Sequence, residues 1–403
     1  MNQARKLIGI VLTSLLVAGT ALAQKVETVD GVRTVHNAKG GLWGKSPKIS
    51  LTKVGTLGDV EATDANLAFY MPSDIALDAS GNLYVLDTGN HRIQKFGPNG
   101  KFLASFGRQG QGPGDFYYPE SFGIDGRGTL FVADTNNQRI QVMAADSKEN
   151  KTIRVPENAV GKIALLRSGL ILMGPGRGVM MIGPGGLEKK EEPGKLLKTI
   201  DLEGRVVSEF GTPFDYGEML LNRMGNEALF TADAADNVYL VFPFQNRIEK
   251  FSPETKLRWK ADRPLNYSVD APKDKGKMEQ QGGRVSFRMP AMNRCASGLA
   301  VDGQGRLWVA TLNRQLKKEE QVSMSVMATI SSGGGRTMGY KPQGDTDLRT
   351  TDAYKLEVFD PDGVLLGEIS VDAFIDGVFI FGDRLFLLDR LRGTRFTEYK
   401  ISG

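Results

Sequence analysis

The chain carries an aspartate, an asparagine and an arginine at the same spacing in two places. The two sets are Asp87, Asn90, Arg92 and Asp134, Asn137, Arg139. An aspartate and an arginine beside a loop are a combination that catalytic sites also use. Because the set occurs in two separate units of the chain, we favour a structural interpretation, in which charge-assisted hydrogen bonds fix a corner between strands. Arg247 holds the equivalent position in a third unit, and we expect the same corner role there.

The supply of residues limits other catalytic chemistry. The sequence has two histidines, His36 and His91, and one cysteine, Cys295. A three-histidine zinc site is therefore impossible, and no disulfide can form within the chain. His91 aligns with Gln138 and Asn246, which indicates a polar repeat position. No Gly-x-Ser-x-Gly nucleophile elbow occurs.

The two sets belong to a longer internal repeat. The segment GNLYVLDTGNHRIQKFG at 81–97 returns 47 positions later as GTLFVADTNNQRIQVMA at 128–144. Weaker copies follow at 236–251, 298–310 and 379–390, and the weakest combines 163–173 with 195–211. A fixed period of this size indicates a repeat architecture, and the copies number six.

Each unit reads as four short strands separated by turn residues such as ASGN and GPNG. One such sheet cannot bury both faces alone, whereas six packed radially share a common core and leave only short edges. The prediction is an all-β, six-bladed propeller with four antiparallel strands per blade. The sixth copy ends after its third strand, so residues 48–58 are expected to supply the fourth and close the ring.

The order of Pro, strand, Gly-Asn, LYVLD and NHRIQKF resembles the NHL repeat. The linker GRQGQGPGDF at 107–116 is similar to that of bacterial exported six-bladed propellers of the NHL-repeat group. The resemblance covers residues 48–403 and is strongest in the first two units. It implies the fold, whereas propellers of this group include protein-binding modules, RNA-binding modules and enzymes.

The N-terminus is expected to be a targeting segment rather than part of the fold. Residues 1–23 combine a basic start, a short apolar core and a small-residue cleavage site near Ala23. We therefore predict a signal peptide over 1–23, a linker over 24–47 and a propeller over 48–403, with the mature protein periplasmic or secreted. No later apolar run is long enough for a membrane span. Removing Arg5 and Lys6 lowers the net charge from +4 to +2, which does not favour nucleic acid or a membrane surface as partner.

The long insertions fall in one topological class. In a propeller blade, second-to-third loops and inter-blade links emerge on one side, and this side receives the excursions at 174–194, 262–296 and 311–353. We interpret it as an elaborated binding side for an unknown protein, peptide or glycan; drift in tolerated surface loops is the alternative. The link at 262–296 supplies the candidate contact residues Tyr267, Arg284, Phe287 and Arg288, although it could equally be a solvated charged loop.

Residues entering the first strand of each blade should surround the mouth of the central channel. The offsets place there Asp74, Ser121, Gly161, Leu229, Gly298 and Asp376. Two carboxylates could bind calcium, as in six-bladed propellers of the lactonase type, whose rings are richer in acidic residues and asparagine. The favoured function is a non-catalytic binding scaffold without a cofactor. The alternative is a calcium-dependent hydrolase or lyase that uses Asp74 and Asp376.

Overall fold

A computed structural model describes residues 24–403 except 145–149, 156–159, 175–193, 282–283 and 331–335. The expected signal peptide, and nearly all of the blade-three loop at 174–194, lie outside this range. In the part that the structure describes, no helix is long and apolar enough to cross a membrane.

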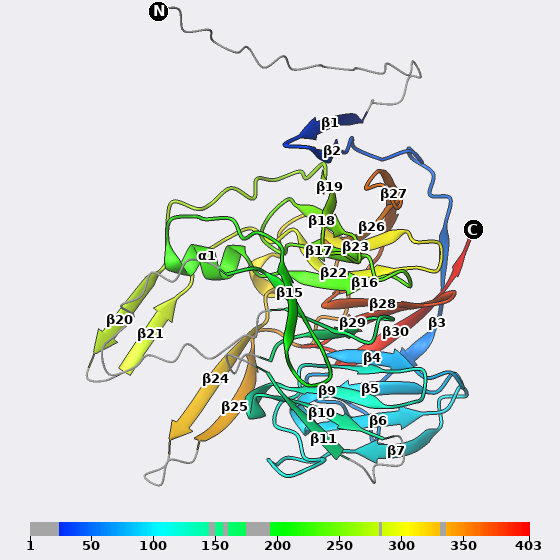
Figure 1. The fold of residues 1–403 in the computed structure, drawn as a ribbon, viewed down its shortest axis with the longest axis vertical. Coiled ribbons are helices and arrows are strands. Elements are labelled where there is room, and N and C mark those ends of the chain that lie inside the picture. The colour runs from blue at the N-terminus through cyan, green and yellow to red at the C-terminus, as the bar shows by residue number, and fades with distance from the viewer. Residues whose placement is uncertain (1–23, 145–149, 156–159, 175–193, 282–283, 331–335) are drawn as a thin grey trace, which may run out of the picture.

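Six antiparallel four-stranded units form the body of the molecule, which confirms the predicted six-bladed propeller (Figure 1). Blade one contains β4 (Asp74–Leu77), β5 (Leu83–Asp87), β6 (Arg92–Phe96) and β7 (Phe102–Phe106). Blade two contains β8 (Ser121–Ile124), β9 (Leu130–Asp134), β10 (Arg139–Met143) and β11 (Asn150–Arg154). Blade three contains β12 (Ile163–Leu165), β13 (Ile171–Met173), β14 (Leu197–Ile200) and β15 (Val206–Phe210).

The remaining blades follow the same order. Blade four contains β16 (Leu229–Ala232), β17 (Val238–Val241), β18 (Ile248–Phe251) and β19 (Leu257–Asp262). Blade five contains β22 (Ala296–Val301), β23 (Leu307–Leu312), β26 (Tyr354–Phe359) and β27 (Leu365–Ser370). Blade six contains β28 (Gly377–Phe381), β29 (Arg384–Asp389), β30 (Arg395–Ser402) and β3 (Ser50–Leu57).

The ring closes as the sequence predicts. Strand β3, which precedes the first blade in the chain, pairs antiparallel with the C-terminal strand β30. The register runs from Ser50 opposite Ser402 to Leu57 opposite Phe396. The last blade is therefore completed by residues from the other end of the chain, so the two ends hold the ring together.

Residues 24–47, expected to be a linker, contain a hairpin instead. Strands β1 (Lys25–Val29) and β2 (Val32–His36) pair antiparallel, and β2 adds parallel to β19, which enlarges the blade-four sheet to six strands. The turn is Asp30-Gly31, with φ of 51° and 78°, and both residues take the left-handed conformation that a two-residue hairpin turn requires.

The core lies between blades rather than in one central mass. Six clusters of buried apolar side chains each join two neighbouring blades, including the pair of blades six and one. Tyr84, Tyr239 and Trp308 are among the largest side chains that are fully buried there. Because every blade buries both faces against its neighbours, the ring forms a rigid support for the loops at its two ends.

Three additional elements extend from the ring. They are helix α1 (Met219–Gly225), hairpin β20–β21 (Lys277–Gln281 and Arg284–Arg288) and hairpin β24–β25 (Ser323–Ile330 and Arg336–Gln343). All three lie on one side of the ring, at the left of Figure 1. We call this side, which carries the second-to-third loops and the inter-blade links, the loop face.

Candidate functional site

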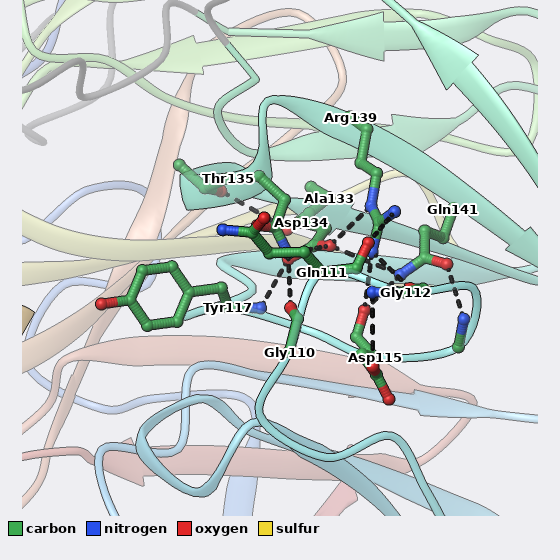
Figure 2. Close-up of polar contacts among 12 residues, drawn as sticks. Gly110, Gln111, Gly112, Asp115, Tyr117, Ala133, Asp134, Thr135, Arg139 and Gln141 are labelled. Atoms are coloured by element: carbon green, nitrogen blue, oxygen red, sulfur yellow. Dashed lines mark hydrogen bonds and ion pairs between the residues drawn. The ribbon is translucent and has the colours of Figure 1, made fainter. Parts of the chain in front are cut away.

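The repeated corner residues form a dense hydrogen-bonded cluster, which Figure 2 shows for blade two. Asp134 is fully buried and accepts hydrogen bonds from the Tyr117 N–H at 2.7 Å, Asn137 Nδ2 at 2.8 Å and Arg139 Nε at 2.9 Å. Gln141 Nε2 donates to the carbonyl of Asp115. Each of the four side chains therefore has at least one hydrogen-bond partner in blade two or in the link that leads into it.

Arg139 also binds the link that leads into blade two. Its terminal nitrogens donate to the carbonyls of Gln111 at 2.8 Å, Gly112 at 2.8 Å and Asp115 at 3.0 Å. Asn137 donates to the carbonyl of Gly110 at 2.8 Å. The glycine-rich link 107–116 is thus held against the corner by side chains that come from the second-to-third turn.

Blade one repeats this geometry with fewer contacts to its link. Arg92 Nε donates to Asp87 at 2.9 Å, and Arg92 also donates to the carbonyl of Ala65 at 2.9 Å. Burial raises the pKa of Asp87 and Asp134, while hydrogen bonds from the neighbouring asparagine and arginine oppose that rise. Both carboxylates are buried and accept hydrogen bonds on both oxygens, so neither is open to a substrate.

The corner is rearranged in blades four and five. Phe242 stands where Asp87 stands in blade one, and Arg247 packs over its ring at 3.9 Å. The carboxylate of blade four lies two positions after Arg247, where Glu249 replaces the Gln94 of blade one. Blade five uses the same substitution, with Glu357 accepting a hydrogen bond from Thr311 at 2.7 Å and pairing with Lys355 at 3.0 Å. Arg247 lies 3.6 Å from Glu249, beyond hydrogen-bonding distance.

Two of the expected channel-mouth residues connect neighbouring blades. Asp74 is buried and accepts the backbone N–H of Phe122 in blade two at 3.2 Å and that of Ile75 at 3.0 Å. Ser121, at the equivalent position, accepts the N–H of Ile163 in blade three at 2.7 Å. Burial raises the pKa of Asp74 to about 6, against the opposing effects of Lys162 and the two backbone N–H groups.

The strand register corrects two of the expected mouth positions. In blade three the residue equivalent to Asp74 is Lys162 rather than Gly161, since Ile163 pairs opposite Met173 as Ile75 does opposite Val85 and the Lys162 carbonyl accepts the Gly174 N–H; in blade six it is Gly377 rather than Asp376, since Gly377 pairs opposite Leu388. In blade six the turn between β28 and β29 is one residue shorter than the corresponding turn of blade one. A position in β28 that is predicted from the alignment of β29 is therefore one residue too early. Asp376 instead accepts the N–H of Arg390 at 3.0 Å.

No set of three or more histidine, cysteine or acidic side chains gathers to hold a metal ion within the ranges that the structure describes. Asp74 is engaged by two backbone donors, and Asp376 by one. Cys295 is buried, its pKa is raised by burial, and Arg263 donates to its sulfur at 3.0 Å.

The long insertion of blade five starts from a tight ionic cluster. Glu320 binds Arg314 through two hydrogen bonds of 2.6 and 2.7 Å, and it accepts a third from Thr351 at 2.7 Å. The Arg314 guanidinium holds the pKa of Glu320 at about 2, well below its usual range. Since Arg314 enters the insertion and Thr351 leaves it, Glu320 joins the two ends and sets the direction of β24–β25.

This hairpin reaches across the loop face to blades one and two. Tyr340, on β25, lies edge-on to Tyr118 with ring centroids 4.5 Å apart, and its carbonyl accepts a hydrogen bond from the Tyr70 hydroxyl. His91 packs against Tyr118 at 4.4 Å, and its Nδ1 accepts the Tyr118 N–H at 3.0 Å. Burial lowers the pKa of His91, which favours a neutral ring. With Tyr117, these residues form what we call the aromatic cluster.

The sequence alone does not indicate the aromatic cluster. Tyr70 and Tyr117 occupy the same repeat position, four residues before the first strand of each blade, so a comparison of link residues identifies them. Tyr340 has no counterpart in the other repeats, and its contact with Tyr70 joins residues 270 positions apart. A partner this distant becomes apparent only in the folded ring.

The link at 262–296 lies on the same face but is anchored to the ring. Tyr267 donates its hydroxyl proton to the carbonyl of Leu312 at 2.8 Å, and burial raises its pKa. Arg288 forms an ion pair with Asp274. The side chains of Arg284 and Phe287, in β21, lie outside what the structure describes. Tyr267 is therefore used to attach the link to blade five.

Comparison with known proteins supports the fold. The family model of the NHL repeat matches residues 69–96 and 116–143, which span the first three strands of blades one and two. Among curated proteins no match is found. Fold and family model together define the chain as a six-bladed β-propeller with NHL repeats in its first two blades.

Solved structures give the same architecture. A member of the duf4221 family from Bacteroides vulgatus is 12% identical, with 88% of this chain and 99% of that chain covered and a TM-score of 0.53. A protein of Bacteroides fragilis described as exported is 10% identical, with 92% and 99% covered and a TM-score of 0.52. A streptogramin B lyase is 11% identical, with 88% and 97% covered and a TM-score of 0.43. At these identities the likeness concerns the fold alone.

Proposed function

We propose that the protein is an exported binding scaffold of the NHL-propeller kind found in bacteria, and that it holds a protein, peptide or glycan on its loop face. Export rests on the basic, apolar and small-residue pattern of residues 1–23. Binding rests on one observation above all: hairpin β24–β25 crosses the loop face and packs its Tyr340 into the aromatic cluster.

The chemistry of the aromatic cluster suits such ligands. Tyr70, Tyr117, Tyr118 and Tyr340 are all half-buried, so each keeps part of its side chain accessible. Tyrosine offers a rigid apolar ring with a polar tip, and it is ordered at low entropic cost because it has few rotatable bonds. A neutral His91 adds a hydrogen-bonding ring without a charge. These properties fit apolar and hydrogen-bonding contact with a peptide or with the faces of a sugar.

The hairpin can be removed without disturbing the ring. Replacing residues 322–344 with a two-residue Asn-Gly turn keeps the cluster of Glu320, Arg314 and Thr351 intact. We expect the shortened protein to keep its thermal midpoint and to lose the partner that copurifies with the full chain from its own envelope fraction. Full recovery of that partner by the shortened protein would refute the proposal.

A point variant tests the same surface with less perturbation. Tyr340→Ala should reduce recovery of the partner, because Tyr340 supplies the ring that packs on Tyr118. Arg127→Ala is a matched control, since Arg127 is exposed in a first-to-second turn on the opposite face. Equal losses from the two variants would show that the loop face is not the binding side.

A further inference from the structure

The groove between blades four and five is occupied by the chain's own N-terminal segment. β2 lies beside β19, and the backbone N–H groups of Leu42 and Trp43 donate to the carbonyls of Leu365 and Leu366 at 3.0 and 2.6 Å. The segment therefore binds along the outer wall of the ring as an extended peptide (Figure 1), and its Lys39 Nζ donates to Asn266 Oδ1 of the link at 262–296 at 3.3 Å.

One side chain of that segment is buried between the two blades. The carboxamide of Asn37 donates to the carbonyls of Asp262 at 2.9 Å and Gly363 at 3.0 Å, and its oxygen accepts the N–H of Leu365 at 2.7 Å. Asn37 is only 7% exposed. The outer groove thus recognises a carboxamide through two main-chain carbonyls and one main-chain N–H.

The same three positions recur between blades three and four. Ala261 pairs with Ile248 in blade four, and Phe210 pairs with Leu197, the equivalent of Ile248, in blade three. The next residues, Asp262 and Gly211, therefore correspond. By repeat alignment and turn geometry, Gly363 corresponds to Thr255 and Leu365 to Leu257. Gly211, Thr255 and Leu257 all line a pocket of about 360 Å³.

A small side chain helps to leave this pocket open. Trp259 of β19 covers the blade-five turn, donating to the carbonyl of Pro361 at 2.9 Å and packing against Gly363. Its counterpart on β15 is Ser208, by the registers of the two blades. Trp259 fills the space between blades four and five. Ser208 is too small to fill the corresponding space between blades three and four.

The deep wall of the pocket carries a carboxylate with unmet hydrogen-bonding capacity. Glu249 is 3% exposed, and its Oε2 has no hydrogen-bond partner among the described residues; nor has Arg247 Nε. Arg247 and Lys260 lie 3.6 and 3.9 Å from Glu249. In blade two the equivalent residue, Gln141, uses both ends of its amide.

We propose that the pocket between blades three and four binds an extended peptide segment of another protein through an asparagine or glutamine carboxamide, in the way that Asn37 fills the adjacent groove. A carboxamide supplies two donors for the carbonyls of Gly211 and Thr255 and one acceptor for the N–H of Leu257; the Gly211 carbonyl already accepts the Leu196 N–H at 3.1 Å and would use its second lone pair. The mixture of Glu249 with Arg247 and Lys260 disfavours a bare cation and a bare anion alike, because each would meet a like charge. This outer-wall site is separate from the proposed loop-face function.

The chain supplies its own probe for this site. A synthetic peptide of residues 24–44 carries Asn37 in its natural surroundings, and it can be titrated into the full mature chain by calorimetry. We expect binding, and at least tenfold weaker binding of the peptide with Asn37→Leu, which removes all three hydrogen bonds. Undetectable binding, or equal affinity of the two peptides, would overturn the proposal.

Variants of the protein locate the peptide. Thr255→Trp should weaken binding at least tenfold, because a large ring at the rim would fill the pocket. Lys256→Trp is the matched control, since Lys256 is exposed and does not line the pocket. Hydrogen exchange gives an independent measure, with protection by the peptide expected at 211 and 255–257. Unchanged affinity of Thr255→Trp, or protection confined to 262 and 363–365, would contradict the proposal.

Discussion

At the scale of single residues, the repeated polar groups stabilise the joints of the ring. Arg139 holds the incoming link of blade two through main-chain carbonyls, and Asp134 holds it through the N–H of Tyr117. Asp74 and Ser121 each bind an N–H of the next blade. A repeat protein needs these joints in every unit, which explains why residues that could do chemistry are used instead for assembly.

Replacing the corner arginines should cost stability in proportion to their contacts. Arg139→Ala removes bonds to Asp134 and to three link carbonyls, whereas Arg92→Ala removes bonds to Asp87 and one carbonyl. We expect losses of about 1 to 4 kcal/mol, with Arg139 at the upper end because it leaves a buried carboxylate less compensated. Denaturant unfolding gives the values. Unchanged stability with a large loss of partner binding would assign the corner to the binding site.

Asp74 should make stability depend on pH. Its pKa is about 6 in the folded protein against 3.8 for the ordinary carboxyl, so the folded state binds more protons than the unfolded state between those values. The free energy of unfolding therefore falls as pH rises from 4 to 6. Asp74→Asn should remove this loss. The free energy of unfolding of the variant minus that of the unmodified protein should therefore rise by about 1 to 3 kcal/mol as the pH is raised from 4 to 7.5.

The same variant distinguishes the calcium alternative. If Asp74 were a calcium ligand, the ion would raise the melting temperature of the unmodified protein and not that of Asp74→Asn. An equal response of the two proteins to calcium, together with the expected pH effect, supports the assignment of Asp74 as a tie between blades. A pH-independent difference between the two proteins would contradict it.

At the scale of elements, the loop-face insertions are attached to the ring at defined points. Glu320 joins the entry and exit of the blade-five insertion, and Tyr340 fixes its far part on blades one and two. Helix α1 and the link of β20–β21 are joined by an ion pair of 2.5 Å between Glu218 and Lys275. Attachment at both ends reduces the entropy that a ligand must remove on binding.

Loss of the Glu320 carboxylate should loosen one element without unfolding the ring. Glu320→Gln weakens the bonds to Arg314 and Thr351, and we expect faster hydrogen exchange across 314–325 and 341–351 with little change in global melting. Because the folded pKa of Glu320 lies near 2, below its usual 4.5, this stabilisation is present above pH 4.5 and is lost as pH falls toward 2. Glu319→Gln, on the exposed neighbour, serves as control, and equal exchange in the two variants would contradict the expectation.

How far these elements follow from sequence depends on whether their contacts are local. The repeat predicts the blades and the corner residues because it records the same local geometry more than once. Asp376 lies one residue before the mouth position that the strand register gives, because the turn between β28 and β29 is one residue shorter than the repeat predicts. The hairpin at 25–36 was missed although its Asp30-Gly31 turn is a strong local signal. The contact of Tyr340 with Tyr70 depends on how distant blades are placed, which a single sequence does not encode locally.

At the scale of the whole molecule, the two chain ends close the ring and one face carries its additions. β3 pairs with β30 over eight residues of strand, whereas the hairpin of β1 and β2 adds only to the outer wall. Strand β3 should therefore contribute more to the stability of the ring than the β1–β2 hairpin, although the two are neighbours in sequence.

Two truncations test the closure. Removing residues 24–58 deletes β3, leaves β30 as an exposed edge and should lower the thermal midpoint far more than removing residues 24–44, which keeps β3. Loss of the shorter segment should mainly uncover the groove that Asn37 fills. A protein lacking 24–58 that melts at the original temperature would contradict closure by β3.

If the molecule binds its partner through the loop face, hydrogen exchange of the complex will show which residues the partner covers. The full mature chain is compared alone and with its copurified partner. We predict slower exchange at residues 65–70, 117–118 and 340–343, around the aromatic cluster, and unchanged exchange in the turns at 78–82 and 125–129 on the opposite face. Protection of those turns, with none at the aromatic cluster, would contradict binding through the loop face.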